Sequence, residues 1–318
     1  MKPAADPTSL AQVLAAEGTE WTVAALYQFK ALQQPDAVQQ ALSELATRLE
    51  LCGTLIVAKE GINGTVAGSR EAIDELHQWL VDMGFDRMEY KESISIGKPF
   101  RRMKVKFKPE IVTLGVEVEP RELVGHYLDP KEWNELISQD DVVIVDTRNR
   151  YEYQAGTFKG AIDPETTTFR EFPAFVEDKL KDAKQKKVAM FCTGGIRCEK
   201  STSLLLQQGF EEVYHLKGGI LNYLEHTPAE DSLWQGECFV FDNRVSVGHG
   251  VQEGDSAMCY GCGWPLQPNE LESTQYERGV SCVHCYDQTT QAQKERYRMR
   301  QQQIDRNLGY FPTSKKPA

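Results

Sequence analysis

The sequence predicts a multidomain protein that combines α/β and α+β architecture. Three observations predict it. The first part of the chain shows strand and helix patterns in the order β-α-β-β-α-β, and the middle part alternates short apolar runs with helices. The last part is irregular and carries two Cys-x2-Cys pairs. The predicted division is an N-terminal extension (1–17), a first domain (18–112), a linker (113–125), a second domain (126–228) and a cysteine-rich C-terminal region with a polar helical tail (229–318).

Bulk composition limits the classes of protein. The chain has 318 residues, of which 41% are hydrophobic and 26% charged, and a formal net charge of -11. Because the whole is acidic, local basic patches must hold any nucleic-acid partner. No stretch approaches the roughly 20 apolar residues of a membrane span, and the start does not resemble a secretory signal, so we expect a cytoplasmic protein without a membrane partner. Eight cysteines in a reducing compartment indicate chemistry or metal binding.

The elements of the first domain follow in order. WTVAALYQFK (21–30) has the pattern of a strand, and residues 35–53 that of an amphipathic helix that begins at Pro35 and ends at Gly53. GTLIVAKEGINGTVAGS (53–69) predicts a hairpin that turns at residues 60–64. Residues 70–85 predict a second amphipathic helix, and residues 98–114 the final strand. This order is the split βαβ, ferredoxin-like arrangement.

A row of basic side chains lies on that final strand. Arg102, Lys104, Lys106 and Lys108 recur at period two, so they project from one face, whereas residues 103, 105 and 107 are apolar. The row is either a solvated outer face or a surface that binds phosphates, where a nucleic-acid backbone would relieve the repulsion between the charges. The RNA-binding candidates are Lys98, Arg101, Arg102, Lys104, Lys106 and Lys108.

The second domain alternates strands and helices. DVVIVDTR (141–148) and KKVAMFC (186–192) are short apolar runs typical of buried parallel strands. A helix follows in CEKSTSLLLQQGF (198–210), and residues 211–225 predict a strand, a Gly-Gly turn and another helix. Functional sites of such sheets lie at the carboxyl ends of the strands, where we expect Cys192.

The loop that begins with Cys192 has the features of an anion site. Gly194 and Gly195 let the backbone turn several amides inward around Thr193 and Ile196, and the following helix adds its N-terminus. Arg197 contributes a permanent positive charge. A thiol in this setting has a lowered pKa and reacts as a thiolate. The alternative is an inert buried cysteine beside a structural turn.

The loop and its surroundings resemble the rhodanese (sulfurtransferase) family. CTGGIR (192–197) is similar to the family's active-site loop, whose cysteine carries a persulfide, and VDTRNRYEYQAGTFKGAI (145–162) and LKGGI (216–220) are similar to flanking motifs. Thr157 departs from the pattern, since the family usually has histidine there. Related tyrosine phosphatases have one more residue between cysteine and arginine. The six-residue loop from Cys192 to Arg197 therefore favours binding of a terminal sulfur over binding of phosphate.

Over nearly the whole chain, the sequence resembles the bacterial rhodanese-domain tRNA uridine hydroxylases. The motifs AKEGINGTVAG (58–68) and CTGGIRCEK (192–200) carry this resemblance. It implies oxygen-dependent 5-hydroxylation of the wobble uridine, with molecular oxygen as co-substrate and the anticodon region of tRNA as partner. The sequence contains no recognisable motif for binding a flavin or a nicotinamide nucleotide, no P-loop and no 2-His-1-carboxylate motif. One hypothesis is that the thiolate adds to C6 of the pyrimidine and makes C5 nucleophilic.

The expected roles of individual residues follow. Cys192 carries the reaction, and Arg197 stabilises its negative charge. Arg148 is an auxiliary residue, which the resemblance implies at the site mouth, and Glu152 pairs with an arginine rather than acting as a base. Cys198 either resolves an oxidised Cys192 as a disulfide or is a small packed side chain.

The C-terminal region predicts a metal site. Cys259, Cys262, Cys282 and Cys285 form two close pairs separated by 19 residues, which is the spacing of a four-thiolate zinc ribbon. The alternatives are redox pairs or free thiols. We interpret His284 as a bystander.

Two other functions compete with RNA hydroxylation. One is a plain sulfurtransferase that passes sulfur from a cysteine persulfide to an acceptor. The other is a non-catalytic redox or binding module that uses the loop as an anion sensor. The basic row on the first domain favours RNA over the sulfurtransferase alternative.

Overall fold

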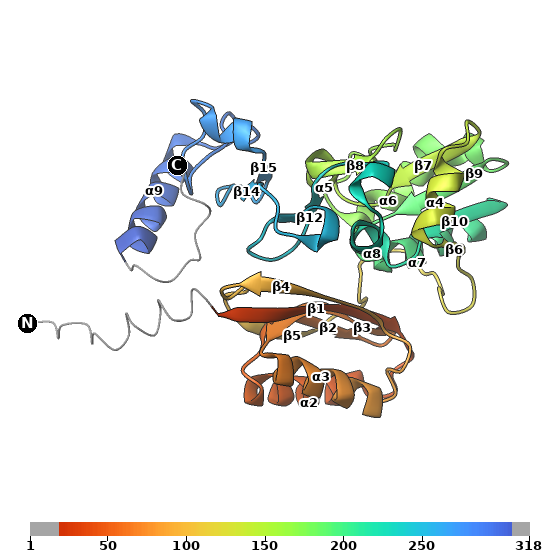
Figure 1. Cartoon of the computed structure of the whole chain (residues 1–318), viewed down its shortest axis with the longest axis horizontal. Helices are drawn as coiled ribbons and strands as arrows, with labels where there is room; N and C mark the ends of the chain where they lie inside the picture. Colours follow the sequence, from red (N-terminus) through yellow and green to blue (C-terminus); the bar gives the residue numbers. More distant parts are fainter. Residues whose placement is uncertain (1–18, 307–318) are drawn as a thin grey trace, which may run out of the picture.

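The computed structural model describes residues 19–306, and the predicted N-terminal extension lies outside these residues. Figure 1 shows a first domain whose sheet carries two helices on one side and faces the second domain with the other. A third region extends from the second domain to the C-terminal helix. The mixed α/β and α+β class predicted from the sequence is confirmed.

The first domain is a five-stranded sheet with strand order β4-β1-β3-β2-β5. Its first four strands in that order are antiparallel to their neighbours, and β5 runs parallel to β2. Its elements are β1 (Glu20–Phe29), α2 (Pro35–Arg48), β2 (Cys52–Ala58), β3 (Gly61–Gly68), α3 (Arg70–Asp82), β4 (Glu89–Ile96) and β5 (Met103–Phe107). The order β-α-β-β-α-β is completed at β4, as in a ferredoxin-like fold.

The expectation that the basic strand closes this fold is wrong. The final strand of the motif is β4, which pairs with β1, whereas β5 is an additional strand at the opposite edge of the sheet. β4 is an edge strand whose sequence EYKESISI is partly exposed on both faces. It therefore lacks the clean alternation of apolar and polar residues that identifies a half-buried strand.

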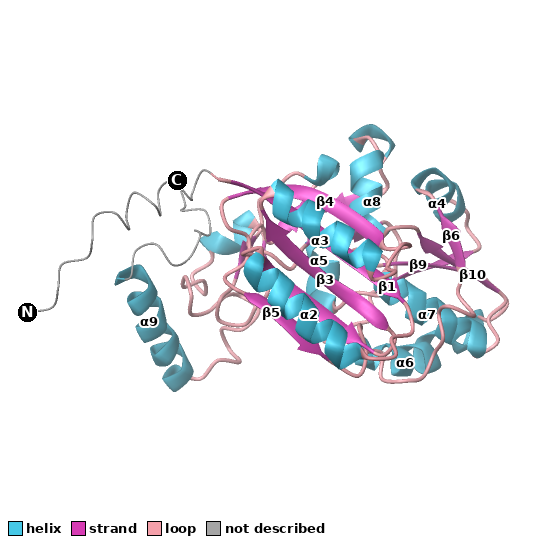
Figure 2. Ribbon diagram, turned by 90° about the horizontal axis from the view of Figure 1, so that it is seen from below, coloured by secondary structure: helices cyan, strands magenta, loops and turns pink. Residues whose placement is uncertain are grey.

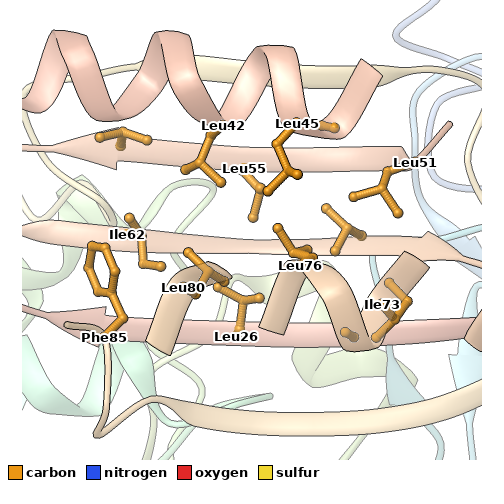
Figure 3. Packing of buried hydrophobic residues seen from close by; sticks show 14 of the residues in the cluster. Leu26, Leu42, Leu45, Leu51, Leu55, Ile62, Ile73, Leu76, Leu80 and Phe85 are labelled. Atoms are coloured by element: carbon orange, nitrogen blue, oxygen red, sulfur yellow. The ribbon is translucent and has the colours of Figure 1, made fainter. Parts of the chain in front are cut away.

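The two helices cover one face of this sheet (Figure 2). Apolar residues at helical spacing, such as Leu42 and Leu45 of α2 and Leu76 and Leu80 of α3, pack on Leu55 of β2, and all are buried (Figure 3). Ser69 caps α3 by accepting a hydrogen bond from the Ala72 amide. Met103 and Val105 of β5 pack against the same core.

The opposite face of the sheet is turned toward the second domain, and we call it the open sheet face (Figure 1). Because side chains alternate along a strand, it carries Tyr27 of β1, Glu89 and Lys91 of β4, and Lys104 and Lys106 of β5. The basic row therefore projects from the open sheet face, as its alternation with apolar residues predicts.

The second domain has a four-stranded parallel sheet with order β6-β10-β9-β7. This confirms the parallel sheet inferred from buried apolar runs. Its elements are β6 (His126–Leu128), α4 (Pro130–Ile137), β7 (Val142–Asp146), α5 (Arg150–Ala155), β8 (Gly156–Phe158), α6 (Phe172–Phe175), β9 (Lys187–Phe191), α7 (Ile196–Gln207), β10 (Glu212–Leu216) and α8 (Gly219–His226).

The C-terminal region is attached to the second domain by β11 (Trp234–Gly236), which pairs with β8. Two short hairpins follow, and α9 (Gln291–Arg306) forms the predicted polar helix. The hairpin strands are β12 (Cys238–Phe239), β13 (Ser246–Val247), β14 (Ala257–Met258) and β15 (Pro265–Leu266). Among the described residues, no helix combines the length and apolar character that crossing a membrane requires.

Candidate active site

Cys192 directly follows β9, at the carboxyl end of the parallel sheet, where sites of this fold class are expected. The first amides of α8 fix the loop, because Ile220 and Leu221 donate to the carbonyls of Cys192 and Thr193 at 2.9 and 3.0 Å. Gly195 has a φ of 99° at the start of α7, a conformation that favours glycine. The amide of Gly195 thereby points at the Cys192 sulfur, 3.1 Å away.

The surroundings of Cys192 favour its thiolate. Burial alone raises its pKa, but a hydrogen bond from the Cys198 thiol, the charge of Arg197 and amides of the loop outweigh burial and lower the pKa of Cys192 to about 6. The Cys198 thiol is the donor of this pair, and burial together with its bond to Cys192 raises its pKa. The surroundings therefore favour a sulfur anion at Cys192 and a protonated thiol at Cys198.

Arg197 does not act on Cys192 alone. Its guanidinium forms a bidentate pair with Glu152 of α5, with both distances 2.7 Å, and Glu152 is fully buried. The Arg197 charge and hydrogen bonds hold the pKa of Glu152 below its usual range despite burial. Glu152 thus pairs locally with an arginine, as expected, and keeps the guanidinium beneath the loop.

Arg148 does not lie at a site mouth, where the resemblance placed it. Its side chain is fully buried and its Nη2 atom lies 2.6 Å from Asp146. The same nitrogen donates to the Gly156 carbonyl, and the guanidinium lies 5.2 Å from the ring centroid of Trp234. Arg148 therefore joins the end of β7 to β8 and serves the fold.

The first domain covers the loop. The hydroxyl of Tyr27 donates to Glu199 at 3.1 Å, and Tyr127 donates to the other carboxylate oxygen at 2.7 Å. Burial raises the pKa of Glu199 to about 7, although both tyrosines oppose this. Cys192 is 0% exposed in this arrangement. A nucleobase reaches the sulfur only if the covering side chains move.

A second contact between the domains lies one residue further along α7. Lys200 is 2% exposed, and its ammonium lies 2.8 Å from Glu60 in the β2–β3 turn and 2.7 Å from Glu110 after β5. Glu60 also accepts a hydrogen bond from the amide of Ile111. Lys200 thus ties the second domain to the hairpin and to the start of the interdomain connection.

The RNA-binding candidates all lie at the β4–β5 connection or along β5. Arg102 and Lys106 are exposed, and their charges lower the pKa of Lys104 between them. The ammonium of Lys98 lies 5.6 Å from the ring centroid of Trp21. This crowding of positive charge is the condition under which a phosphate backbone binds favourably. These residues do not approach Cys192 in the described contacts.

The four C-terminal cysteines come together. The sulfur atoms of Cys259, Cys262, Cys282 and Cys285 all lie within 4.8 Å of one another. Four thiolates at this separation fit the tetrahedral coordination of zinc. His284 instead stacks on Trp264, with ring centroids 4.7 Å apart, and lies outside the cluster.

Sequence reasoning missed Tyr27, Glu199 and Lys200 as site residues. Glu199 and Lys200 end the motif CTGGIRCEK and Glu60 opens EGINGT, so both motifs were noticed. Nothing in the local sequence shows that they touch, because the contacts of Glu199 and Lys200 join residues between 72 and 172 positions apart. The sequence around Lys200 gives no local signal of burial, because the same helix face carries the polar residues Arg197 and Ser203.

Comparisons with known proteins place these domains. Residues 21–111 match the model described as "UPF0176 acylphosphatase like domain", and residues 129–226 match "Rhodanese-like domain". A protein of Acinetobacter baumannii (strain AYE) named "tRNA uridine(34) hydroxylase" is 68% identical over 89% of this chain and 90% of its own length. A protein of the same name from Deinococcus radiodurans is 64% identical over 90% of this chain and 95% of its own length. Another, from Teredinibacter turnerae, is 52% identical over 90% of this chain and 90% of its own length.

Proposed function

The chain belongs to the family of tRNA uridine(34) hydroxylases, and from this premise we propose that it hydroxylates uridine 34 of tRNA at C5, with Cys192 as the reacting group. The observation that carries the role of Cys192 is the Gly195 amide 3.1 Å from a sulfur whose pKa is lowered to about 6. A thiolate held in this way is a nucleophile at neutral pH.

The proposed chemistry begins with addition of the Cys192 thiolate to C6 of the pyrimidine. The new S–C6 bond moves the electron pair of the C5=C6 double bond onto C5, which then attacks oxygen. One oxygen atom stays on C5, and the other leaves as water after it takes two electrons and two protons from a thiol reductant, which becomes a disulfide. Loss of the C5 proton restores the double bond and expels the thiolate.

The neighbours of Cys192 have separate parts in this proposal. The amide of Gly195 and the charge of Arg197 stabilise the thiolate before addition and after expulsion. Glu152 keeps Arg197 in place, since a buried guanidinium needs a paired carboxylate. Cys198 donates a hydrogen bond to the sulfur, and it is placed to form a disulfide with Cys192 when that sulfur is oxidised.

The tRNA would bind by its backbone to the exposed basic residues along β5. Three of them, Arg102, Lys106 and Lys108, are exposed on or next to β5, so binding should depend steeply on salt. We propose the anticodon region as the part that binds, because uridine 34 lies there.

We further propose that the four C-terminal cysteines hold a structural zinc ion. Two Cys-x2-Cys pairs provide four thiolates and leave no position open for substrate, which is typical of a structural site. Arg300 of α9 donates to the carbonyls of Tyr260 and Gly279 beside these pairs. The metal would therefore fix the position of α9.

A sulfurtransferase activity is the second candidate, and the six-residue loop of the rhodanese type favours it. Purified protein, incubated with unmodified tRNA, a thiol reductant and oxygen-18 gas, tests the proposal. Mass spectrometry of the nucleosides should find one oxygen-18 atom in the product from uridine 34. Sulfur transfer from thiosulfate to cyanide by the same preparation, without any oxygen in uridine, would favour the alternative.

A further inference from the structure

A cavity of about 870 Å³ lies between the two domains. Its walls come from β4 of the first domain and from α4, the β10–α8 turn and α8 of the second. Residues that line it include Glu89, Lys91, Lys131, Lys217, Gly218 and Asn222. Its volume falls in the range of pockets that hold small ligands, which is large enough for one nucleotide.

The cavity reaches the active-site loop through Gly218. The Cα atom of Gly218 lies 3.7 Å from the position that a Cβ atom on Gly195 would take. The amide of Gly195 in turn bonds the Cys192 sulfur. Gly218, which lines the cavity, therefore packs against the glycine whose amide bonds the reacting atom.

Tyr27 contacts Gly195 from the first domain. Its hydroxyl lies 2.8 Å from the same Cβ position on Gly195, and in the sheet Tyr27 pairs with Glu89, which lines the cavity. Its bond to Glu199 holds the ring over the loop. Tyr27 therefore lies over the loop whose Cys192 is 0% exposed.

The lysines of the cavity suit a nucleotide. Lys131 and Lys217 are exposed, and neither forms an ion pair within the part of the chain that the structure describes. Lys91 instead bonds Asn222 across the domains. Four acidic residues share the walls: Glu89, Asp129, Glu135 and Asp231. The cavity is therefore polar and carries charges of both signs. Such a site suits a nucleotide, whose ribose and base form hydrogen bonds and whose phosphates would bind the two lysines. It suits a fatty ligand or a purely anionic ligand less well.

We propose that this cavity is the binding site for the reacting nucleotide of an RNA strand, and that Tyr27 is a positioning residue that closes its inner end until the nucleotide displaces it. The inference rests on the proposed function, because it takes the ligand to be RNA. Closure of the site would also keep the thiolate from oxidants while no RNA is bound.

Photo-crosslinking tests the binding site. An anticodon stem–loop RNA carrying 4-thiouridine at position 34 should crosslink to peptides that contain Tyr27 or residues 217–222. Lys217→Gln should lower the yield several-fold, whereas Lys186→Gln, an exposed lysine outside the cavity, should not. Crosslinks confined to other parts of the chain would overturn the inference.

Alkylation of Cys192 by iodoacetamide tests the role of Tyr27 without any RNA reaction. Tyr27→Phe removes the bond to Glu199, so alkylation should be roughly 10-fold faster or more, the factor expected when a hydrogen bond to a charged group is lost. Tyr90→Phe, which removes a hydroxyl that bonds Glu92 of the same domain, is the matched control. Equal rates in wild type and Tyr27→Phe would contradict the closure.

The two failures are distinguishable. If wild-type protein hydroxylates uridine 34 but crosslinks elsewhere, the inference about the cavity is wrong and the proposed function stands. If wild-type protein does not hydroxylate tRNA at all, the proposed function is wrong, whatever the alkylation rates.

Discussion

The ammonium of Lys200 lies 2.8 Å from the carboxylate of Glu60, and this ion pair joins the motif CTGGIRCEK of the second domain to EGINGT of the first. Lys200 immediately follows the helix turn that carries Cys198 and Glu199. The two stretches that make the sequence recognisable are therefore one structural unit. The first domain therefore packs directly on the segment that carries the candidate active site.

Replacing Lys200 should loosen the docking of the domains. Lys200→Met leaves Glu60 and Glu110 without their cation, and we expect a loss of about 2–3 kcal/mol, somewhat below the cost for fully buried pairs because both carboxylates are partly exposed. Chemical denaturation measures this loss. Arg48→Met, which breaks an exposed pair with Glu75, should cost less than about 1 kcal/mol. Equal stability of the two variants would contradict the role of Lys200.

The reactivity of Cys192 should follow its lowered pKa. The thiolate fraction, and with it the alkylation rate, should rise with pH around a midpoint of about 6. Because folding lowers this pKa, the thiolate contributes stability that is complete above the ordinary thiol pKa and is lost as the pH falls through about 6. Cys198→Ala removes a hydrogen-bond donor and should move the midpoint upward. Cys238→Ala, another buried cysteine, should leave it unchanged.

Removal of zinc should affect the C-terminal region alone. We expect about one zinc ion per chain, and Cys282→Ser, with a buried ligand lost, should abolish binding. Limited proteolysis should then cleave between residues 257 and 306 while the first two domains resist. Cys52→Ser lies outside the cluster and serves as control. Protein that is free of metal when purified anaerobically, with α9 still protected, would argue for free thiols.

The basic row should account for part of the salt dependence of tRNA binding. Each of Lys104→Gln, Lys106→Gln and Lys108→Gln should weaken binding and lower the slope of log K against log salt by roughly 0.7–0.9. Lys186→Gln, on the exposed connection before β9, is the matched control. Filter binding at several salt concentrations gives the slopes. Unchanged slopes in all three variants would show that the row is only a solvated face.

The fold was predictable where a local pattern carried it. Apolar runs such as DVVIVDTR and KKVAMFC predict buried parallel strands, and both are in the sheet. β4 was not predictable, because both faces of this edge strand are partly exposed and its sequence does not alternate cleanly. MKVKF alternates more strongly, and for this reason the sequence wrongly predicts β5, and not β4, as the last strand of the motif.

The candidate site divides in the same way. The anion-binding character of the loop from Cys192 to Arg197 was predictable, because the loop contains two glycines and directly follows a strand. The contacts made by Tyr27 and Lys200 could not, since they depend on how two domains pack. The burial of Arg148 was also hidden, because an arginine two residues after Asp146 is equally compatible with an exposed position and with the buried pair that the structure has.

The most direct test of the central claim is nucleoside analysis of tRNA from a strain that lacks this protein and is complemented with Cys192→Ala. If the sulfur anion carries the chemistry, wild-type protein should restore 5-hydroxyuridine and the nucleosides derived from it, and Cys192→Ala, expressed to the same level, should restore none. Full restoration by Cys192→Ala would contradict the account.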